Sequence, residues 1–466
     1  MIPLRLSEIA EIVGGTLHGE DATVTADLEY DSRKVEPGGL FAAFAGEKAD
    51  GHDFAAQTPA AGVLGTRPVE GGLRPEGGLR PEGGPRPEGG RPVEGKPTVV
   101  VDDVREAMSL LARAVLQRLP ELTVIGITGS SGKTSTKDMV GQLLARVGPT
   151  IAPPGTLNNE LGLPYTVLKS NRDTRFLVLE MGARGIGHIT HLASIAPHHV
   201  GVVVNVGVAH IGEFGSVEAI AKAKAELVQA LPPDGLAVLN GDDPLVAAMA
   251  QASPAPVRLV HTPEVTLDEL GRPSFDLGGR KVTLALSGAH QAGNALLAAA
   301  VAVHCGLDEA EVPGALAELR LISGRRMDVY DRADGVTVID DSYNANPAST
   351  AVALKALAAL GRSRRKVAVL GYHAELGASE RDGHAEVGAL AASLGVDVVI
   401  VVEESAAPIL DGVASVRSWE GESVLVNDQA AAVSALRQRL RPGDVVLVKG
   451  SRYRTWDVAD FLRAAA

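Results

Sequence analysis

The sequence predicts an α/β protein of three domains, two of them built on parallel sheets. Two observations favour this fold class: apolar runs alternate with helix-like segments from residue 121 onward, and a second such series follows RLISGRRMD. A third is length, since 466 residues are too many for one hydrophobic core. Hydrophobic residues make up 45% of the chain and charged residues 22%, as in ordinary folded proteins.

The central domain is expected to span residues 105–318. Its amphipathic first helix, VREAMSLLARAVLQRL, would connect it to the preceding domain. Four runs rich in Leu and β-branched residues then alternate with helical segments: LTVIGITG, RFLVLEMG, VGVVVNVG and GLAVLNGD. Such runs are typical of parallel strands with both faces covered. FDLGGRKVTLALSG predicts a hairpin, and AHQAGNALLAAAVAVH predicts a buried helix.

The C-terminal domain is expected to span residues 319–466. Its strands would be VTVIDDS, RKVAVLGY, VDVVIVV and DVVLVKGS, again separated by helical segments. This alternation is typical of a separate doubly wound, Rossmann-like domain.

The first domain, residues 1–104, has a mixed α/β pattern. A short helix precedes YDSRKVEPGGLFAAFAGEKADGHDF, which predicts strands and turns. Residues 67–96 repeat five near-identical hexads rich in Pro, Gly and Glu. Such a segment has almost nothing to bury, so we expect a flexible surface insertion rather than a docking arm.

Composition excludes several classes of function. The net charge of −13 argues against coating of nucleic acid or stable association with anionic membranes. The single cysteine, Cys305, excludes an internal disulfide and a multi-cysteine metal site. The N-terminus has no uninterrupted apolar region and no run reaches the roughly 20 apolar residues of a membrane span. We therefore expect a cytoplasmic protein, acting as a monomer on anionic small molecules.

The stretch GITGSSGKTSTKDM indicates nucleotide binding. It does not strictly fit the usual phosphate-loop spacing, because Gly126 falls one residue early and Ile127 follows it. The physical requirements are met nevertheless: a strand precedes, a helix follows, and glycines allow a phosphate close to the backbone. The bland alternative is a Gly-Ser turn with a chance Lys-Thr. The candidate nucleotide-binding residues are Gly129, Ser130, Ser131, Gly132, Lys133, Thr134 and Ser135.

Further polar residues end the next two strands. Glu180 closes VLEMGA and His210 follows NVGVA, so both belong to the edge where open α/β sheets bind ligands. Each alone would more often be a solvated strand-end carboxylate or a polar loop residue. Beside the hydroxyl of Thr134, Glu180 becomes a candidate Mg²⁺ ligand and His210 a candidate ligand of a second divalent ion.

The helical segment GSVEAIAKAKAELV adds a lysine whose role its position does not explain. Glu218 and Lys222 are spaced for a solvated surface bridge. Lys224 lies on another face, and a cation beside a metal site would be repelled. The residues alone favour another solvated lysine.

Taken in order, nine motifs resemble the Mur ligases, the ATP-dependent enzymes that build the peptide of bacterial cell-wall precursors. Each motif is weak alone, but the ordered set is specific and covers nearly the whole chain outside the hexads. The motifs are GITGSSGKTSTKDM, NNELGLP, VLEMGA, NVGVAHIG, AKAKAEL, HQAGNALLAAA, GRRMDVYD, IDDSYNANP and VKGS.

Within the family, DDSYNANPAST resembles the ligase that acts last, which joins D-alanyl-D-alanine to UDP-N-acetylmuramoyl-tripeptide. The resemblance implies a first domain that binds the uridine nucleotide, a central ATPase domain and a C-terminal ligase domain. ATP and Mg²⁺ are the implied cofactors.

The resemblance also implies roles for single residues. Lys133, Glu180, His210 and Lys224 would be catalytic, and Lys224 matches a lysine that the family carbamylates, which turns a cation into an anionic ligand. Thr134, Glu180, His210 and Lys224 would hold metal. Asn294 would contact adenine, Arg326 phosphate and Asp341 ribose. The implied substrate-binding residues are Asp31, Ser32 and Arg33 at the uridine and Asn158 and Asn159 at the muramoyl peptide.

One departure concerns the C-terminal domain, where the family often has Gly-Asp-Met-x-Glu-Leu-Gly. This chain has LGYHAELG, with Tyr372 and His373 at the Asp-Met positions, and no methionine follows KGSR. We assign no catalytic role there. Two alternatives stay open. One is another amide ligase of the superfamily, such as the diaminopimelate-adding ligase or folylpolyglutamate synthetase, and the other is a P-loop kinase or switch that makes no amide.

Overall fold

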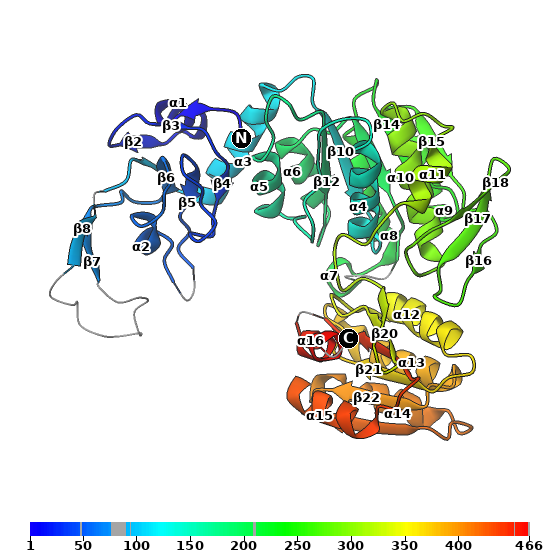
Figure 1. Ribbon diagram of the computed structural model, residues 1–466. Coiled ribbons are helices and arrows are strands. Elements are labelled where there is room, and N and C mark those ends of the chain that lie inside the picture. Colours follow the sequence, from blue (N-terminus) through cyan, green and yellow to red (C-terminus); the bar gives the residue numbers. More distant parts are fainter. Residues whose placement is uncertain (47–48, 76–89, 94, 208–210, 452, 465–466) are drawn as a thin grey trace.

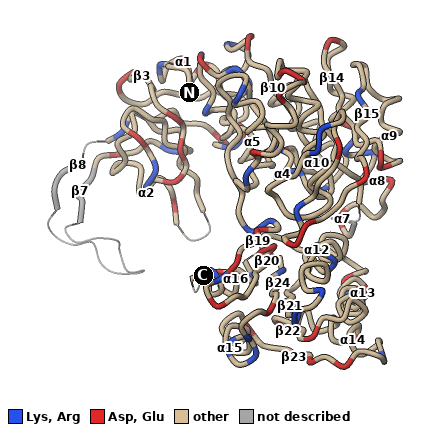
Figure 2. The backbone as a smooth tube through the Cα atoms, turned by 45° about the vertical axis from the view of Figure 1, so that its right-hand side comes forward, with Lys and Arg blue, Asp and Glu red and all other residues tan. Residues whose placement is uncertain are grey.

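The computed structural model describes residues 1–46, 49–75, 90–93, 95–207, 211–451 and 453–464. Three larger sheets follow one another along the chain, and the first and last parts attach to the central part at separate places (Figure 1). Acidic and basic residues are interspersed over all three parts (Figure 2). None of the helices within the described ranges is long and apolar enough to cross a membrane.

The first part has a five-stranded sheet of order β2-β9-β6-β5-β4, in which only β2 runs antiparallel to its neighbour. Its elements are β1 (Leu4–Arg5), α1 (Leu6–Val13), β2 (Thr16–His18), β3 (Thr23–Val24), β4 (Leu28–Glu29), β5 (Leu40–Ala42), α2 (His52–Ala55), β6 (Gly62–Gly65) and β9 (Thr98–Val100). Near the ends of the hexad segment, β7 (Gly72–Pro75) and β8 (Gly90–Val93) pair as an antiparallel ribbon. Composition did not predict this pairing, because backbone hydrogen bonds need no apolar side chains.

The central part has a six-stranded parallel sheet of order β11-β12-β10-β13-β14-β15. Its strands are β10 (Thr123–Thr128), β11 (Thr150–Ile151), β12 (Phe176–Glu180), β13 (Val200–Val203), β14 (Leu236–Asn240) and β15 (Val257–Val260). The expected parallel sheet is confirmed for its four apolar strands. The edge strands β11 and β15 were not predicted, because they are short and none of their residues is fully buried.

Helices cover both faces of this sheet, as expected for its continuously apolar strands (Figure 1). The helices of the central part are α3 (Val104–Gln117), α4 (Lys133–Leu144), α5 (Gly162–Val167), α6 (His188–Ile195), α7 (Ile211–Phe214), α8 (Val217–Gln229), α9 (Pro244–Ala247), η1 (Ala248–Ala252), α10 (His290–His304) and α11 (Val312–Ala317). The predicted hairpin is confirmed as β17 (Pro273–Leu277) and β18 (Arg280–Thr283), with β16 (Thr266–Leu267) added beside β17.

The C-terminal part has a six-stranded sheet of order β19-β20-β24-β21-β22-β23, in which only the edge strand β19 is antiparallel. Its elements are β19 (Asp328–Asp331), β20 (Thr337–Asp340), α12 (Pro347–Leu360), β21 (Lys366–Leu370), η2 (Gly377–Ser379), α13 (Glu380–Ser393), β22 (Val398–Val402), η3 (Glu404–Ala406), α14 (Pro408–Ser415), β23 (Glu422–Val426), α15 (Gln429–Arg439), β24 (Val445–Lys449) and α16 (Trp456–Ala464). The four predicted strands and the doubly wound pattern are confirmed.

The hydrophobic cores differ in how they join the three parts. One core is continuous from the first part into one face of the central sheet, through Leu6, Met108 and Val124. The opposite central face has a second core, which includes Ile125 and Ile127 of β10. The C-terminal sheet has cores of its own on its two faces. The domain boundaries at 104/105 and 318/319 remain our proposed division.

Candidate active site

The phosphate loop joins the buried strand β10 to α4. Gly132 has a φ of +76°, in the left-handed region that favours glycine, and a Cβ there would lie 3.1 Å from Asn294 Oδ1. The backbone N–H groups of Ser130 and Ser131 donate to Asn205 Oδ1 at 3.0 and 2.9 Å. The loop leads into the N-terminus of α4, an arrangement that favours phosphate, and Asn205 takes two of the loop's backbone donors in this structure.

Lys133 is the first residue of α4, and its Nζ donates to Gly129 O at 2.8 Å. Burial lowers the pKa of Lys133, with Glu180 opposing that shift and Arg326 adding to it.

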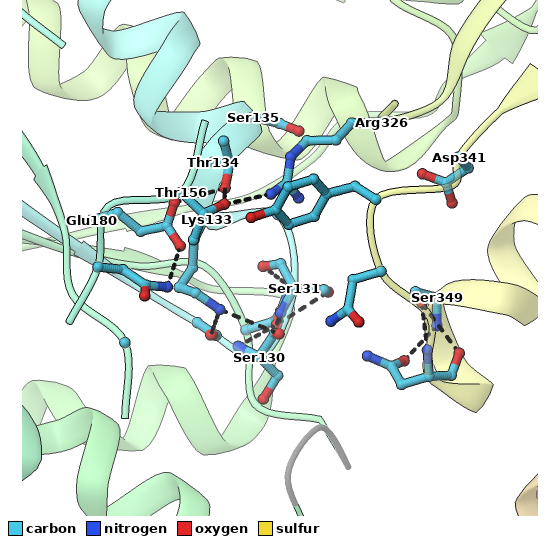
Figure 3. Close-up of a pocket in the computed structure, with 18 of the residues that line it drawn as sticks. Ser130, Ser131, Lys133, Thr134, Ser135, Thr156, Glu180, Arg326, Asp341 and Ser349 are labelled. Carbon is cyan, nitrogen blue, oxygen red and sulfur yellow. Dashed lines mark hydrogen bonds between the residues drawn. The ribbon is translucent and has the colours of Figure 1, made fainter. Parts of the chain in front are cut away.

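Glu180 lies at the end of β12, beside the start of α4. Its Oε2 accepts from Thr134 Oγ1 at 2.6 Å and its Oε1 accepts from Asn158 Nδ2 at 2.8 Å (Figure 3). Thr134 and Glu180 are both buried. The prediction that these residues meet is correct, because parallel strands end at one edge of the sheet. Asn158, predicted to hold substrate, here orients the carboxylate of Glu180.

Lys224 extends from α8 into the same cavity and is only 4% exposed. Burial, together with the charge of Lys133, lowers the pKa of Lys224 to about 7. The interpretation of Lys224 as a solvated lysine, which its position alone favoured, is therefore wrong. Gly126 of β10 allows this placement, since a Cβ there would lie 3.0 Å from Leu227 Cδ1 of the closely packed α8.

His210 lies outside the described residues, so its part in a second metal site stays a prediction. Within the described ranges, no group of three or more His, Cys, Asp and Glu side chains is arranged to hold a metal ion. Thr134 and Glu180 nevertheless bring hard oxygen ligands together. This set fits Mg²⁺, which commonly takes one or two carboxylates and completes its shell with phosphate oxygens and water.

A cavity of about 570 Å³ extends from the phosphate loop to the C-terminal part. Arg326 and Asp341 enter it from the C-terminal side, and Asn294 enters from α10. Arg326 stacks on Tyr343, with Cζ 4.1 Å from the ring centroid. Asp341 accepts from Met327 N at 3.0 Å and from Lys449 Nζ at 2.5 Å. All seven predicted phosphate-loop residues line this cavity: Gly129, Ser130, Ser131, Gly132, Lys133, Thr134 and Ser135.

The predicted substrate residues divide between two places. Asn159 lines the cavity together with Asn158, and its Oδ1 caps the start of α5 through Gly162 N at 2.9 Å. Asp31, Ser32 and Arg33 belong to the first part and are not among the residues that line the cavity. Asp31 and Arg33 form two hydrogen bonds of 2.8 Å, and this pairing lowers the pKa of Asp31 to about 2.

Several residues of the cavity were not singled out from the sequence. Asn205 and Lys449 each follow or end an apolar strand, so the argument that found Glu180 would also have found them. Lys449 is buried and donates to Asp341 and to Asn344 O at 2.8 Å. Thr156 touches Thr134 and Arg326, but it lies in a loop and no local pattern marks it.

Tyr372 and His373 do not line the cavity, although Glu375 of the same loop does. His373 is fully buried and stacks on His384, with ring centroids 4.7 Å apart. The backbone N–H of His373 donates to His384 Nε2 at 2.9 Å, and His384 Nδ1 donates to Glu380 O at 2.7 Å. The pair therefore lies behind the loop whose Glu375 lines the cavity, and it fixes the backbone of that loop at His373.

Comparison with known families finds three matches along the chain. The family model described as "Mur ligase middle domain" matches residues 127–302, and "Mur ligase, glutamate ligase domain" matches residues 325–452. "Mur ligase family, catalytic domain" matches residues 26–67.

Among curated proteins, the UDP-N-acetylmuramoyl-tripeptide–D-alanyl-D-alanine ligase of Mycobacterium leprae is 44% identical over 97% of this chain and 96% of its own length. The ligase of that name from Mycobacterium tuberculosis is 46% identical with the same coverage. Among solved structures, MurF from Acinetobacter baumannii has a TM-score of 0.81 at 28% identity, with 99% of each chain covered. MurF ligase from Thermotoga maritima in complex with ADP has a TM-score of 0.73 at 27% identity, covering 95% of this chain and 99% of its own.

Proposed function

The chain belongs to the Mur ligase family, and from this premise we propose that it joins D-alanyl-D-alanine to UDP-N-acetylmuramoyl-tripeptide at the expense of ATP. The observation that carries the proposal is the identity of 44 to 46% over 97% of the chain with ligases of that name. The cavity supports it, because a phosphate loop, a carboxylate and a buried lysine face the C-terminal part across one space. Such an enzyme takes part in peptidoglycan precursor synthesis.

The reaction must activate a carboxylate, which is a poor electrophile in water. A carboxylate oxygen of the tripeptide attacks the γ-phosphorus of ATP, the bond to the β,γ-bridging oxygen breaks, and ADP leaves. The amine of D-alanyl-D-alanine then attacks the acyl carbon, loses a proton, and phosphate departs with its oxygen. Two unit charges at 4 Å repel by about 4 kcal/mol at an effective dielectric near 20, so the first step needs cations.

Lys133 and Arg326 are two of the cationic side chains that line the cavity. We propose that Thr134 and Glu180 hold Mg²⁺, which would neutralise charge on the phosphates and the attacking carboxylate. Glu180→Ala should lose activity by orders of magnitude while its circular dichroism stays unchanged. Full turnover of this variant would remove Glu180 from the metal site.

Lys224 fits the proposed carbamylation because its amine is buried and its pKa is lowered to about 7. A neutral amine adds to CO₂ and a charged one does not. The carbamate would be an anion, so it would attract a metal that the ammonium form repels. We propose that this modified lysine and His210 hold a second divalent ion.

ATP and the uridine-nucleotide substrate would contact different parts of the chain. We propose that Asn294 contacts adenine and Asp341 ribose, with Arg326 on the phosphates. Asp31, Ser32 and Arg33 would border the uridine, and Asn158 and Asn159 the muramoyl peptide. We propose that the protein acts as a monomer in the cytoplasm, where ATP is available.

The test is phosphate release from ATP by the full chain. We expect release only when UDP-N-acetylmuramoyl-tripeptide and D-alanyl-D-alanine are both present, with the amide product confirmed by mass spectrometry. Diaminopimelate with UDP-N-acetylmuramoyl-dipeptide is the matched control for another ligase of the family. Release without an amine acceptor would identify a kinase or switch and reject the proposal.

A further inference from the structure

Four polar side chains form a continuous row across the boundary between the central and C-terminal parts (Figure 3). Arg326 Nη2 donates to Thr156 Oγ1 at 2.7 Å. Thr156 Oγ1 is 3.2 Å from Thr134 Oγ1, and Thr134 Oγ1 is 2.6 Å from Glu180 Oε2. The row thus connects the C-terminal side of the cavity to the two oxygen ligands proposed for Mg²⁺.

The two ends of the row fix the direction of every hydrogen bond in it. An arginine has only donors, so Thr156 Oγ1 must accept from Arg326. An ionised carboxylate only accepts, so the hydroxyl hydrogen of Thr134 must point to Glu180. The one hydrogen left, that of Thr156, then donates to Thr134 Oγ1. Each hydroxyl has a single hydrogen, and no other assignment satisfies both ends.

This direction matters for the oxygen of Thr134. With its own hydrogen committed to Glu180 and one lone pair accepting from Thr156, Thr134 Oγ1 keeps its remaining lone pair for a cation. Without Thr156, the hydroxyl of Thr134 is held from one side only and rotates more freely. A cation ligand that is oriented in advance costs less ordering when the cation binds.

We propose that Thr156 is a positioning residue, which orients the Thr134 hydroxyl for the nucleotide-bound cation and makes that orientation depend on Arg326. The inference rests on the proposed function only in taking Thr134 as a cation ligand. Arg326 can hold Thr156 and contact phosphate at the same time. Its Nη2 donates to Thr156, while its Nε is buried without a partner among the described residues. Thr156 itself is half-buried in the loop between β11 and α5 and lines the cavity.

The test measures binding of Mn²⁺ and ADP to the full chain by electron paramagnetic resonance, without turnover. Thr156→Val keeps the shape of the side chain and removes the hydroxyl, whereas Thr156→Ser keeps the hydroxyl. We expect the Val variant to bind Mn²⁺ in the presence of ADP about tenfold more weakly, the size expected for one hydrogen bond near a charge. The Ser variant should stay within about twofold of the unaltered chain.

A double-mutant cycle tests the dependence on Arg326. In an Arg326→Met background the side chain has no donor left to fix the row, so Thr156→Val should weaken Mn²⁺ binding by less than about twofold more. Equal Mn²⁺ binding by the Val, Ser and unaltered chains would overturn the proposal, as would full additivity in the cycle. Unchanged melting temperatures show that the variants fold. If the unaltered chain forms no amide but the variants change Mn²⁺ binding as expected, the proposed function is rejected and this inference stands.

Discussion

At the scale of single residues, Lys224 shows how burial can prepare a side chain for chemistry. None of the described residues accepts a hydrogen bond from its Nζ, and a charged amine there is disfavoured by both burial and Lys133. The lowered pKa follows from the packing of α8 against β10, so the fold itself supplies the neutral amine that carbamylation needs.

Lys224→Ala should therefore abolish amide formation, and added short carboxylates should restore part of it by occupying the space of the missing carbamate. The measurement is phosphate release with both substrates, with and without acetate or propionate. Lys222→Ala is the matched control, because Lys222 is an exposed lysine of the same helix. Inactivity that no carboxylate relieves would count against the carbamate.

The pair of His373 and His384 leads to a prediction about pH. Burial lowers the pKa of both imidazoles, and for His373 the charges of His384 and Lys449 lower it further, well below its usual value. Tyr372 and Thr350 also face the pair, and Glu380 accepts from His384 through its backbone. The unfolded chain therefore binds more protons than the folded chain below pH 6.5, and stability falls as the pH falls.

His373→Gln removes this titration while keeping a polar side chain beside Thr350. Between pH 7.5 and 5.5, we expect the unaltered chain to lose about 1.4 kcal/mol more unfolding free energy than the variant, since each buried neutral histidine contributes that much one unit below its unfolded pKa. Thermal unfolding at the two pH values measures the difference. His304→Gln, at an exposed position, should leave the loss unchanged, and equal losses for all three proteins would contradict the prediction.

Residues at strand ends were predictable from local pattern, whereas loop residues such as Asn158 and Arg326 were predicted only through the family resemblance and Thr156 was not predicted at all. Thr134 and Glu180 were found because a phosphate loop and a strand end are local patterns whose meeting point the sheet fixes. Thr156 contacts residues 22 and 170 positions away, and nothing in its own neighbourhood encodes these contacts. The burial of Lys224 was missed for the same reason, since it depends on how α8 packs on the sheet.

At the scale of elements, α6 and α8 are tied together by one buried carboxylate. Gly187, which precedes α6, has no capping side chain. Glu226 of α8 takes that place, accepting from Gly187 N at 2.6 Å, from Thr190 N at 2.9 Å and from Thr190 Oγ1 at 3.0 Å. A negative charge at a helix N-terminus is favourable, so the contact stabilises both helices. It also fixes the turn of α8 that carries Lys224.

Glu226→Ala should lower the free energy of unfolding by about 2 kcal/mol, because buried N–H groups lose their acceptor. Urea unfolding measures this loss, and amide exchange at Thr190 should speed up in parallel. Gln229→Ala changes an exposed residue on the same helix and should stay within about 0.5 kcal/mol of the unaltered chain. A Glu226→Ala protein as stable as that control would show that solvent replaces the carboxylate.

The strands at the edges of the central and C-terminal sheets were not predicted from the sequence. The central apolar strands were found because continuous Val, Ile and Leu runs are needed where helices cover both faces. β11 has two partly exposed residues, β15 exposes Arg258 and Leu259, and β23 begins with the exposed Glu422 and Ser423. A strand that buries so little depends on pairing with its neighbour, which the sequence does not display.

At the scale of the whole molecule, the C-terminal part is held differently from the first part. The first part shares a hydrophobic core with the central sheet, whereas the C-terminal sheet has cores of its own. Residues 318–327 connect the central part to the C-terminal part. Polar contacts attach this connection to α4, the helix that follows the phosphate loop. Gln142 Nε2 donates to Arg320 O at 2.9 Å and Gln142 Oε1 accepts from Arg320 N at 2.9 Å.

Further along the connection, Asp138 Oδ2 accepts from Ser323 N at 3.0 Å, and Ser323 Oγ accepts from Gly155 N at 2.8 Å. Beyond these contacts, Arg325 and Met327 have φ values of 61° and 52°, in the left-handed region that is strained for side chains of this kind. The polar contacts therefore hold a strained segment on the helix that begins at Lys133, which couples the position of Arg326 to the phosphate loop.

Gln142→Ala should loosen this attachment locally without unfolding the sheets. Hydrogen exchange at the Arg320 amide should become about tenfold faster, since its acceptor is lost, while the Ser323 amide stays protected by Asp138. Asp138→Asn should show the converse pattern because a neutral amide oxygen is a weaker acceptor. Gln117→Ala, at an exposed position of α3, is the control for a glutamine far from the connection. If Arg320 exchanges equally fast in the Gln142→Ala and unaltered chains, Gln142 does not hold the connection on α4.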